Sequence, residues 1–169
     1  MRKAFTLIEM MISIVILSIM LLFLYRSYSS LNRSNEVYEK KMEQIQNFET
    51  KKKLFFSDFT LSLFDSVQIL NQDKSNDVVF LQTTNSVHQR FNPYIAYIVK
   101  GHELYRLESL KPFKTYPLPQ DSEFDIDNLG KIKSFRVYAS PTNKRDFILH
   151  VEFYGMQTIL MKIKALNEE

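Results

Sequence analysis

An apolar run near the N-terminus constrains this chain more than any other feature. Residues 5–25 read FTLIEMMISIVILSIMLLFLY, with no charge after Glu9 and no Gly or Pro. At 1.5 Å per residue, a helix over this run is about 30 Å long, which matches the hydrocarbon core of a bilayer. The sequence therefore predicts a single membrane-spanning helix over residues 5–25.

Two other kinds of segment have similar runs, a secretory signal peptide and a plain signal anchor. A signal peptide is disfavoured because the run is too long and no small-residue cleavage site follows it before Arg26. A plain anchor explains the hydrophobicity. It does not explain the start of the run, where Arg2-Lys3-Ala4 precedes it and an acid lies inside it.

That acid, Glu9, is a candidate functional residue. A charge at mid-membrane depth is costly, and ionised residues there usually have a partner. If the chain were cut between Ala4 and Phe5, the new α-amine of Phe5 would lie one helical turn from Glu9, in the same chain or in a neighbouring subunit. A carboxylate is also stabilised near a helix N-terminus.

The segment KAFTLIEMMISIVIL resembles the class III leader and first helix of type IV pilins and type II secretion pseudopilins. The resemblance covers residues 2–25: a short basic leader, an aromatic first mature residue, an acid four residues later and an apolar helix. It implies cleavage after Ala4 by the prepilin peptidase, N-methylation of Phe5 and a role for Glu9 in assembly. Ala4 stands where the family usually has Gly, and Glu9 argues against the tip-type pseudopilin that lacks this acid.

Basic residues flank the run on both sides, so charge alone does not decide its orientation. Arg2 and Lys3 precede it, and the residues that follow include Arg26 and Arg33. The resemblance implies an inner-membrane protein with a cytoplasmic N-terminus and a periplasmic C-terminal domain.

The helix is expected to continue after Arg26, because no helix-breaking residue follows for a long way. The first Pro is Pro93 and the first Gly is Gly101. Apolar residues recur mostly at steps of three and four, which predicts an amphipathic helix to about Leu70. We expect the half after Phe48 to pack on the chain's own sheet, and the half before it to contact neighbouring helices. The stripe comprises Leu31, Tyr38, Met42, Ile45, Phe48, Phe55, Phe59, Leu63, Val67 and Leu70.

The rest of the chain alternates apolar and polar residues, which predicts antiparallel strands with one covered face. The clearest hairpin turns at Gly101-His102, and a Pro- and acid-rich loop is expected between Pro112 and Leu129. The fold class is therefore α+β, a long N-terminal helix packed on two small meanders. The predicted strands cover residues 78–83, 94–100, 103–109, 132–139, 147–154 and 159–164. The predicted regions are a leader (1–4), a filament-core helix (5–25), an amphipathic helix (26–72) and a β domain (73–169).

Two inner segments add a second resemblance. The stretch from Tyr94 to Arg106, with its Gly turn and Leu-x-Arg, resembles a hairpin of the larger minor subunits, the J-type of type II secretion and the W-type of type IV pili. The segment LFFSDF at residues 54–59 resembles their helix, with an aspartate among apolar residues.

Signatures of catalysis are missing. The chain has 3 His, widely spaced, and no Cys, so no thiolate chemistry or zinc pattern is predicted. Three scattered Gly cannot form a phosphate or dinucleotide loop, and we predict neither an enzyme nor a cofactor.

An acidic stretch offers oxygen ligands at alternating positions, a pattern that could suit Ca²⁺. Ile126 and Ile132 stand where an EF-hand needs Gly and Glu, so a solvated acidic loop is the preferred interpretation and calcium the alternative. The candidate ligands are Asp121, Glu123, Asp125 and Asp127.

DNA is a further alternative partner, because basic residues alternate with tyrosines. The chain has 22 Lys+Arg against 19 Asp+Glu, and removal of Arg2 and Lys3 leaves it almost neutral, which disfavours many phosphate contacts. The residues concerned are Arg90, Tyr94, Lys100, Tyr105, Arg106, Lys111, Lys114 and Tyr116.

The resemblance implies a minor pilin or pseudopilin that initiates or completes a type IV pilus or a type II secretion pseudopilus. Its implied partners are the prepilin peptidase, other minor and major pilins or pseudopilins, and the inner-membrane assembly platform. Two alternatives stay open: a competence filament subunit that contacts DNA, and an unprocessed, membrane-anchored periplasmic domain.

Overall fold

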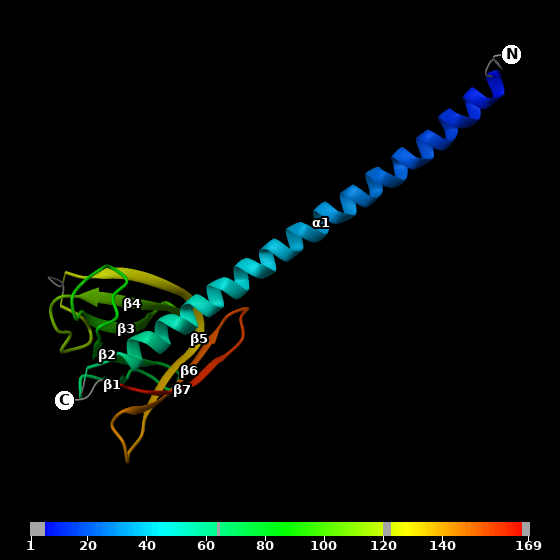
Figure 1. Cartoon of the computed structure of the whole chain (residues 1–169). Helices are drawn as coiled ribbons and strands as arrows, with labels where there is room; N and C mark the ends of the chain where they lie inside the picture. The colour runs from blue at the N-terminus through cyan, green and yellow to red at the C-terminus, as the bar shows by residue number, and fades with distance from the viewer. Residues whose placement is uncertain (1–5, 64, 120–122, 167–169) are drawn as a thin grey trace. The chain divides into compact units, whose positions relative to one another are not determined.

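The computed structural model describes residues 6–63, 65–119 and 123–166. They form one long helix followed by an antiparallel sheet, which confirms the α+β fold (Figure 1). The chain divides into two units, Met1–Gln46 and Asn47–Glu169, and the second is called the head below. The elements are α1 (Leu7–Thr60), β1 (Gln68–Asn71), β2 (Asp77–Gln82), β3 (Tyr94–Lys100), β4 (Glu103–Ser109), β5 (Asp125–Ala139), β6 (Asp146–Phe153) and β7 (Ile159–Lys164).

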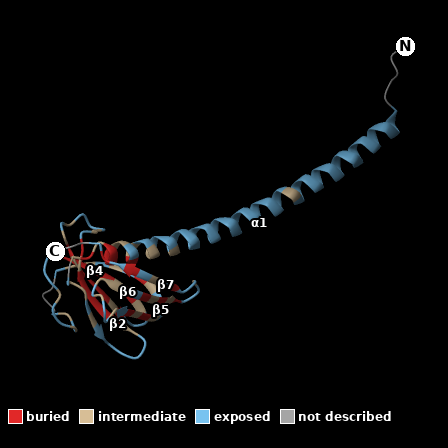
Figure 2. Ribbon diagram, turned by 60° about the horizontal axis from the view of Figure 1, so that its bottom comes forward, coloured by how far each residue is buried: buried red, intermediate tan, exposed pale blue. Residues whose placement is uncertain are grey.

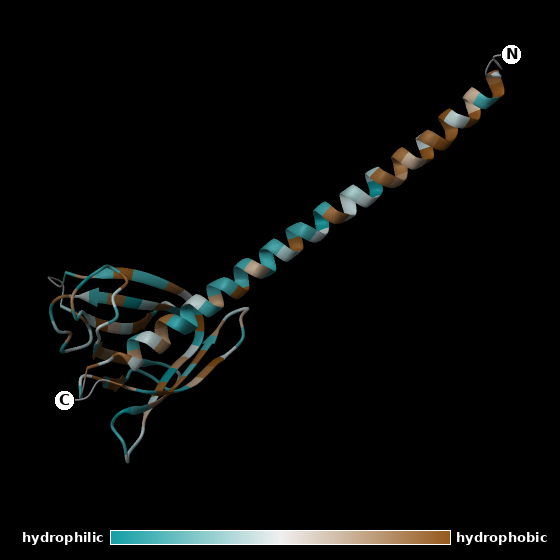
Figure 3. Cartoon of the chain, in the orientation of Figure 1, coloured by the Kyte–Doolittle hydropathy of each residue, from teal (hydrophilic) through white to brown (hydrophobic). Residues whose placement is uncertain are grey.

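The first unit contains the apolar run, visible as the brown start of α1 in Figure 3. By length and composition this part of α1 can cross a membrane. The Ser13 and Ser18 hydroxyls donate to the carbonyls of Glu9 and Ile14, at 2.7 and 2.8 Å. Such back-bonding satisfies both hydroxyls within the helix. The run therefore offers its surroundings an almost entirely apolar surface, which is consistent with membrane anchoring.

The sheet of the head is a seven-stranded meander in the order β1 to β7. It curls, so that the start of β2 meets the middle of β5. There the Asp77 carboxylate accepts the Val137 N–H at 2.9 Å, and the Phe135 N–H donates to the Ser75 carbonyl at 3.1 Å. β5 pairs with both β4 and β6, so the two predicted meanders are one continuous sheet that shares this strand.

The core of the head lies between the last turns of α1 and the sheet, where the buried residues gather in Figure 2. Phe55 and Phe59 are fully buried, and their rings lie 5.3 and 6.2 Å from the ring of Tyr97. Phe48 and Leu54 pack against the same cluster. These contacts confirm the predicted packing on the chain's own sheet for Phe48, Phe55, Phe59 and Val67, whereas Leu70 is 40% exposed.

The helix ends earlier than predicted, at Thr60 instead of about Leu70. Apolar residues keep a helical spacing through Val67, but Ser62 already forms a β-bridge with Thr83 and the Leu63 N–H donates to the Gln82 carbonyl at 2.8 Å. Asp65, with a left-handed φ of 53°, then turns the chain further. Leu70 then pairs with Val78 as part of β1. The pairing of β1 with β2 outweighs the local helical pattern.

The expected loop up to Leu129 is also partly wrong, because β5 begins at Asp125 instead of Ile132. Its first half pairs with β4, from Asp125 opposite Glu108 onward. Gly130, with φ 103°, lies next to a shift in the pairing register and adopts a backbone conformation that residues with a Cβ rarely reach.

Candidate functional site

The start of α1 forms a capping box between Thr6 and Glu9. The Thr6 N–H and hydroxyl each donate to one oxygen of the Glu9 carboxylate at 2.9 Å, and the Glu9 N–H donates to the Thr6 hydroxyl at 3.4 Å. This reciprocal arrangement satisfies two of the free backbone donors at the helix N-terminus, the N–H groups of Thr6 and Glu9. The acid in the apolar run therefore already has a partner in its own chain. Sequence reasoning missed Thr6, although Thr-x-x-Glu is a known signature of a capping box.

Ala4 and Phe5 lie outside the described residues. Cleavage after Ala4, N-methylation of Phe5 and pairing of the Phe5 amine with Glu9 therefore remain predictions.

A second polar site lies inside the head, where α1, β3 and β4 meet around Arg106. The guanidinium donates to Asp58 and Glu108 at 2.8 Å each, and all three side chains are fully buried. The Tyr97 hydroxyl donates to Asp58 at 2.6 Å. The structure thus joins the aspartate of the LFFSDF segment to the arginine of the Leu-x-Arg hairpin. Both had been singled out in the sequence, but their contact was not predicted.

The environment of this cluster shifts the pKa values of Arg106, Glu108 and Tyr97. Burial alone would lower the pKa of Arg106, but hydrogen bonds and charge from Asp58 outweigh it and raise that pKa. Burial would raise the pKa of Glu108, but hydrogen bonds from Ser86 and Arg106 outweigh it and lower that pKa. Burial and the charge of Asp58 raise the pKa of Tyr97 well above its usual value. All three pKa values move away from neutral pH, which suits a structural anchor better than acid–base catalysis.

The carboxylates of the cluster also hold the loop of residues 84–93. The Asn85 amide donates to Asp58 at 2.6 Å. The Ser86 hydroxyl and the Val87 N–H both donate to Glu108, the latter at 3.1 Å. The carboxylates of Asp58 and Glu108 can accept more hydrogen bonds than the Arg106 guanidinium donates to them. The loop supplies the remaining donors.

The same loop is tied to the beginning of β5. Arg90 binds Asp125 at 2.6 Å, and His88 lies 3.1 Å from Asp127. Asp127 also accepts from Arg106 at 3.2 Å, so it links the loop to the buried cluster. Five loop residues between positions 85 and 90 therefore form hydrogen bonds or ion pairs with four carboxylates of the head. These are Asp58 on α1, Glu108 on β4, and Asp125 and Asp127 on β5.

These contacts change the interpretation of the acidic stretch. Asp125 and Asp127 are strand residues paired with cationic or donor side chains, so they are not part of a solvated loop. Glu123 is exposed, and Asp121 lies outside the described residues. Within the described part of the chain, no group of three or more His, Asp or Glu is arranged to hold a metal ion.

The basic residues considered for DNA are not all available at the surface. Arg106 is fully buried, and Arg90 is engaged with Asp125. Lys111 and Lys114 are exposed after β4. The predicted basic surface is therefore reduced, which leaves fewer cations for a phosphate backbone.

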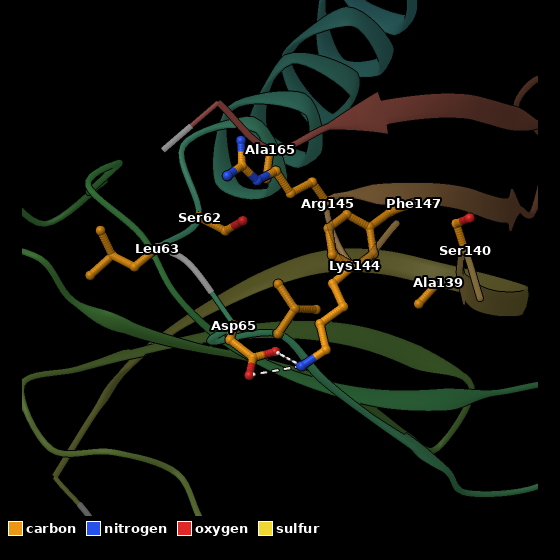
Figure 4. A pocket seen from close by; sticks show the side chains of 10 residues that line it. Ser62, Leu63, Asp65, Ala139, Ser140, Lys144, Arg145, Phe147 and Ala165 are labelled. Carbon is orange, nitrogen blue, oxygen red and sulfur yellow. Dashed lines mark hydrogen bonds and ion pairs between the residues drawn. The ribbon is translucent and has the colours of Figure 1, made fainter. Parts of the chain in front are cut away.

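A small cavity of about 240 Å³ lies beside the end of α1 and the β5–β6 connection (Figure 4). The Lys144 ammonium points at the Asp65 carboxylate, 3.0 Å away. Ser140 and Phe147 contribute to the wall. The Ser140 hydroxyl lies 3.0 Å from the Thr142 hydroxyl, and the Lys144 ammonium is engaged with Asp65, so these two lining groups are not paired with each other as a nucleophile and a base.

Comparison with known proteins identifies a family motif at the N-terminus. Residues 1–25 match the family model described as the prokaryotic N-terminal methylation motif. No curated protein matches the chain. This motif, on a long apolar helix followed by an antiparallel sheet, fits a type IV pilin-like protein. It implies processing by a prepilin peptidase and assembly with other pilins in a membrane.

Proposed function

We propose that this protein is a minor pilin or pseudopilin, a structural subunit without enzymatic activity that helps to initiate or complete a type IV pilus or a type II secretion pseudopilus. One observation carries the proposal: the methylation motif of residues 1–25 continues into a helix whose described side chains from Thr6 to Arg26 are all exposed in the single chain. Such a surface needs lipid or neighbouring helices around it.

Before assembly, residues 5–25 would lie in the inner membrane, with the head in the periplasm. Thr6 then keeps the Glu9 carboxylate hydrogen-bonded in the stored subunit. After cleavage, the amine of Phe5 becomes available as a cation for Glu9. A paired charge inside an apolar bundle is far less costly than an unpaired one, so this pairing would set the register at which a subunit enters the filament.

The next part of α1 supplies further contacts. Leu31, Tyr38, Met42 and Ile45 are 57–68% exposed. Their steps of three, four and seven place them on one side of a helix. We expect this stripe to pack against the helices of neighbouring subunits once the apolar run has left the lipid.

Mass spectrometry of the mature N-terminus tests processing directly. The expected result is a chain that begins with N-methylated Phe5. A protein that still begins with Met1 would overturn the proposal and leave a membrane-anchored domain of another kind.

Glu9→Ala tests the role of the acid. We expect membrane insertion to persist and incorporation into filaments to fall, because the Phe5 amine loses its partner. Glu36→Ala, an exposed acid further along α1, serves as the matched control. Normal assembly of Glu9→Ala would rule out the pairing.

A further inference from the structure

The end of the head at which α1 enters it brings together segments that are far apart in the sequence. The Lys51 ammonium on α1 lies 4.0 Å from the sulfur of Met156, in the turn between β6 and β7. The Tyr154 N–H donates to the Lys131 carbonyl at 3.0 Å, and the Lys133 ammonium lies 5.7 Å from the centre of the Tyr154 ring. In Figure 1, β5 and the tip of the β6–β7 hairpin lie beside α1 at this end.

This end, called the basic end below, carries more positive than negative charge. Glu103 lies opposite Lys100 in one strand pair and opposite Lys131 in the next, so one acid stands between two lysines. Lys51 and Lys133 form no ion pair among the described residues. The charged residues of the basic end are five lysines and two glutamates: Lys51, Lys52, Lys100, Lys131, Lys133, Glu49 and Glu103.

The excess of three positive charges is confined to this end. Lys52 and Glu49 offset each other at 3.8 Å, and Glu152, the next acid along β6, lies 3.5 Å from His150. From Asn47 onward the whole head has 16 Lys+Arg and 15 Asp+Glu. Without the basic end, 11 Lys+Arg and 13 Asp+Glu remain, so the rest of the head is slightly acidic.

The membrane anchor of the same chain favours one partner for this end. Residues 26–46 join the head to the apolar run, and as part of α1 they span about 30 Å. The head is therefore tethered near the membrane surface, where even weak contacts form at a high effective concentration. Clusters of lysine close to a membrane-spanning helix are attracted to anionic phospholipids.

The aromatic side chain at this end suits the same partner. Tyr154 is 54% exposed, and Lys133 lies over its ring. Tyrosine and lysine are amphipathic side chains that are favoured at the interface between membrane and water. Nucleic acid is less well matched, because an excess of three charges supports few of the phosphate contacts on which its binding depends.

We propose that the basic end of the head binds the anionic phospholipid headgroups of the membrane in which the chain is anchored. The exposed side chains of Lys100, Lys131 and Lys133 contact the phosphates, Lys51 adds to the positive potential, and the Tyr154 ring enters the headgroup layer. The contact depends on the membrane anchor and not on filament assembly, so it goes beyond the proposed function. A subunit that enters a filament would have to break it.

Fluorescence of the full-length chain in lipid vesicles tests the contact. The chain has no Cys, so Gln157→Cys and Thr142→Cys each carry a single fluorophore, both at exposed positions. Position 157 lies at the basic end, and position 142 lies in the turn at the other end of β6. A quencher attached to lipid headgroups reports how close each position is to the membrane surface.

Quenching at position 157 should be several-fold stronger in vesicles of phosphatidylglycerol and phosphatidylcholine than in phosphatidylcholine alone. High salt should remove the difference, because it screens exposed charges. Quenching at position 142 should be the same in both kinds of vesicle. Equal quenching at position 157 in the two kinds of vesicle would overturn the inference. A fluorophore at position 157 that responds to added duplex DNA but not to phosphatidylglycerol would also overturn it, and would assign these cations to nucleic acid.

Charge variants give a second readout. Lys131→Gln combined with Lys133→Gln should lower the quenching at position 157 several-fold in the anionic vesicles. Lys144→Gln combined with Lys164→Gln removes the same charge at the other end of β6 and should leave the quenching unchanged. Thermal melts verify that both double variants are folded, and an equal loss of quenching in both would contradict the inference. The vesicles contain no assembly machinery, so failure of this test leaves the proposed function standing, and an unprocessed N-terminus does not affect the lipid contact.

Discussion

The Asp58 carboxylate and the Arg106 guanidinium lie 2.8 Å apart, and neither side chain is exposed. They are 48 residues apart in the chain, one on the last turns of α1 and the other in the middle of β4. Their contact fixes the helix to the sheet inside the head. A buried ion pair adds little net stability by itself, but the loss of one partner is costly because a charge stays buried and unpaired.

We therefore expect Arg106→Met to lower the free energy of unfolding of the head by about 3–5 kcal/mol, since Asp58 and Glu108 keep their burial without the guanidinium. Urea unfolding of the full chain in detergent measures this. Lys144→Met is the control, because the Lys144–Asp65 pair is 72% and 57% exposed and should contribute less than about 1 kcal/mol. Equal losses in the two variants would contradict a buried anchor.

The head should lose stability in acid through Glu108. Hydrogen bonds from Ser86 and Arg106 outweigh burial and lower its pKa. A carboxyl with a lowered folded-state pKa contributes stability that is fully present above its unfolded-state pKa, about 4.3, and is lost as the pH falls through the folded value. We expect the melting temperature to be nearly constant above about pH 5 and to fall below about pH 4.

Glu108→Gln should reduce the fall in melting temperature below about pH 4. Glu49→Gln is the matched control, because Glu49 is exposed and its ion pair with Lys52 is long, at 3.8 Å. If the melting temperature fell equally with pH in both variants, Glu108 would not be the cause of the acid sensitivity.

Gly130 should tolerate a side chain poorly. Its φ of 103° is a backbone conformation that residues with a Cβ rarely adopt, whereas space is not limiting, because the added Cβ would make only an ordinary contact of 3.5 Å with the Lys51 ammonium nitrogen. We expect Gly130→Ala to destabilise the head by about 2–3 kcal/mol. Gly155→Ala, at φ 71° with open space around it, should cost only about 1 kcal/mol. Thermal melts of the two variants check the order, and the reverse order would refute it.

The capping box predicts a role for the Thr6 hydroxyl. Thr6→Val removes one of the two donors to the Glu9 carboxylate while retaining the backbone N–H. Loss of an N-cap side chain costs about 1 kcal/mol, so the first turn of α1 should open more often in the variant, which hydrogen exchange of its amides in the membrane-embedded chain measures. Thr6→Ser keeps a hydroxyl and should match the unmodified chain. Equal exchange in the Val and Ser variants would exclude this role.

Local sequence patterns were sufficient to predict much of this structure. The basic leader, Glu9 and the uninterrupted apolar residues specify a membrane-compatible helix because hydrophobic length and charge are properties of a short segment. The hairpin around Gly101 was also predictable, since a turn with positive φ at Gly101 and His102 joins two alternating strands.

Tertiary contacts decided the rest, because they join residues that no local pattern connects. The helical spacing beyond Thr60 gave way once residues 68–71 could pair with β2, and the acidic residues of 125–127 became a strand once β4 offered an edge. Arg106 looked like a surface cation in the sequence. Only folding placed it between Asp58 and Glu108, where burial without those two carboxylates would be prohibitively costly.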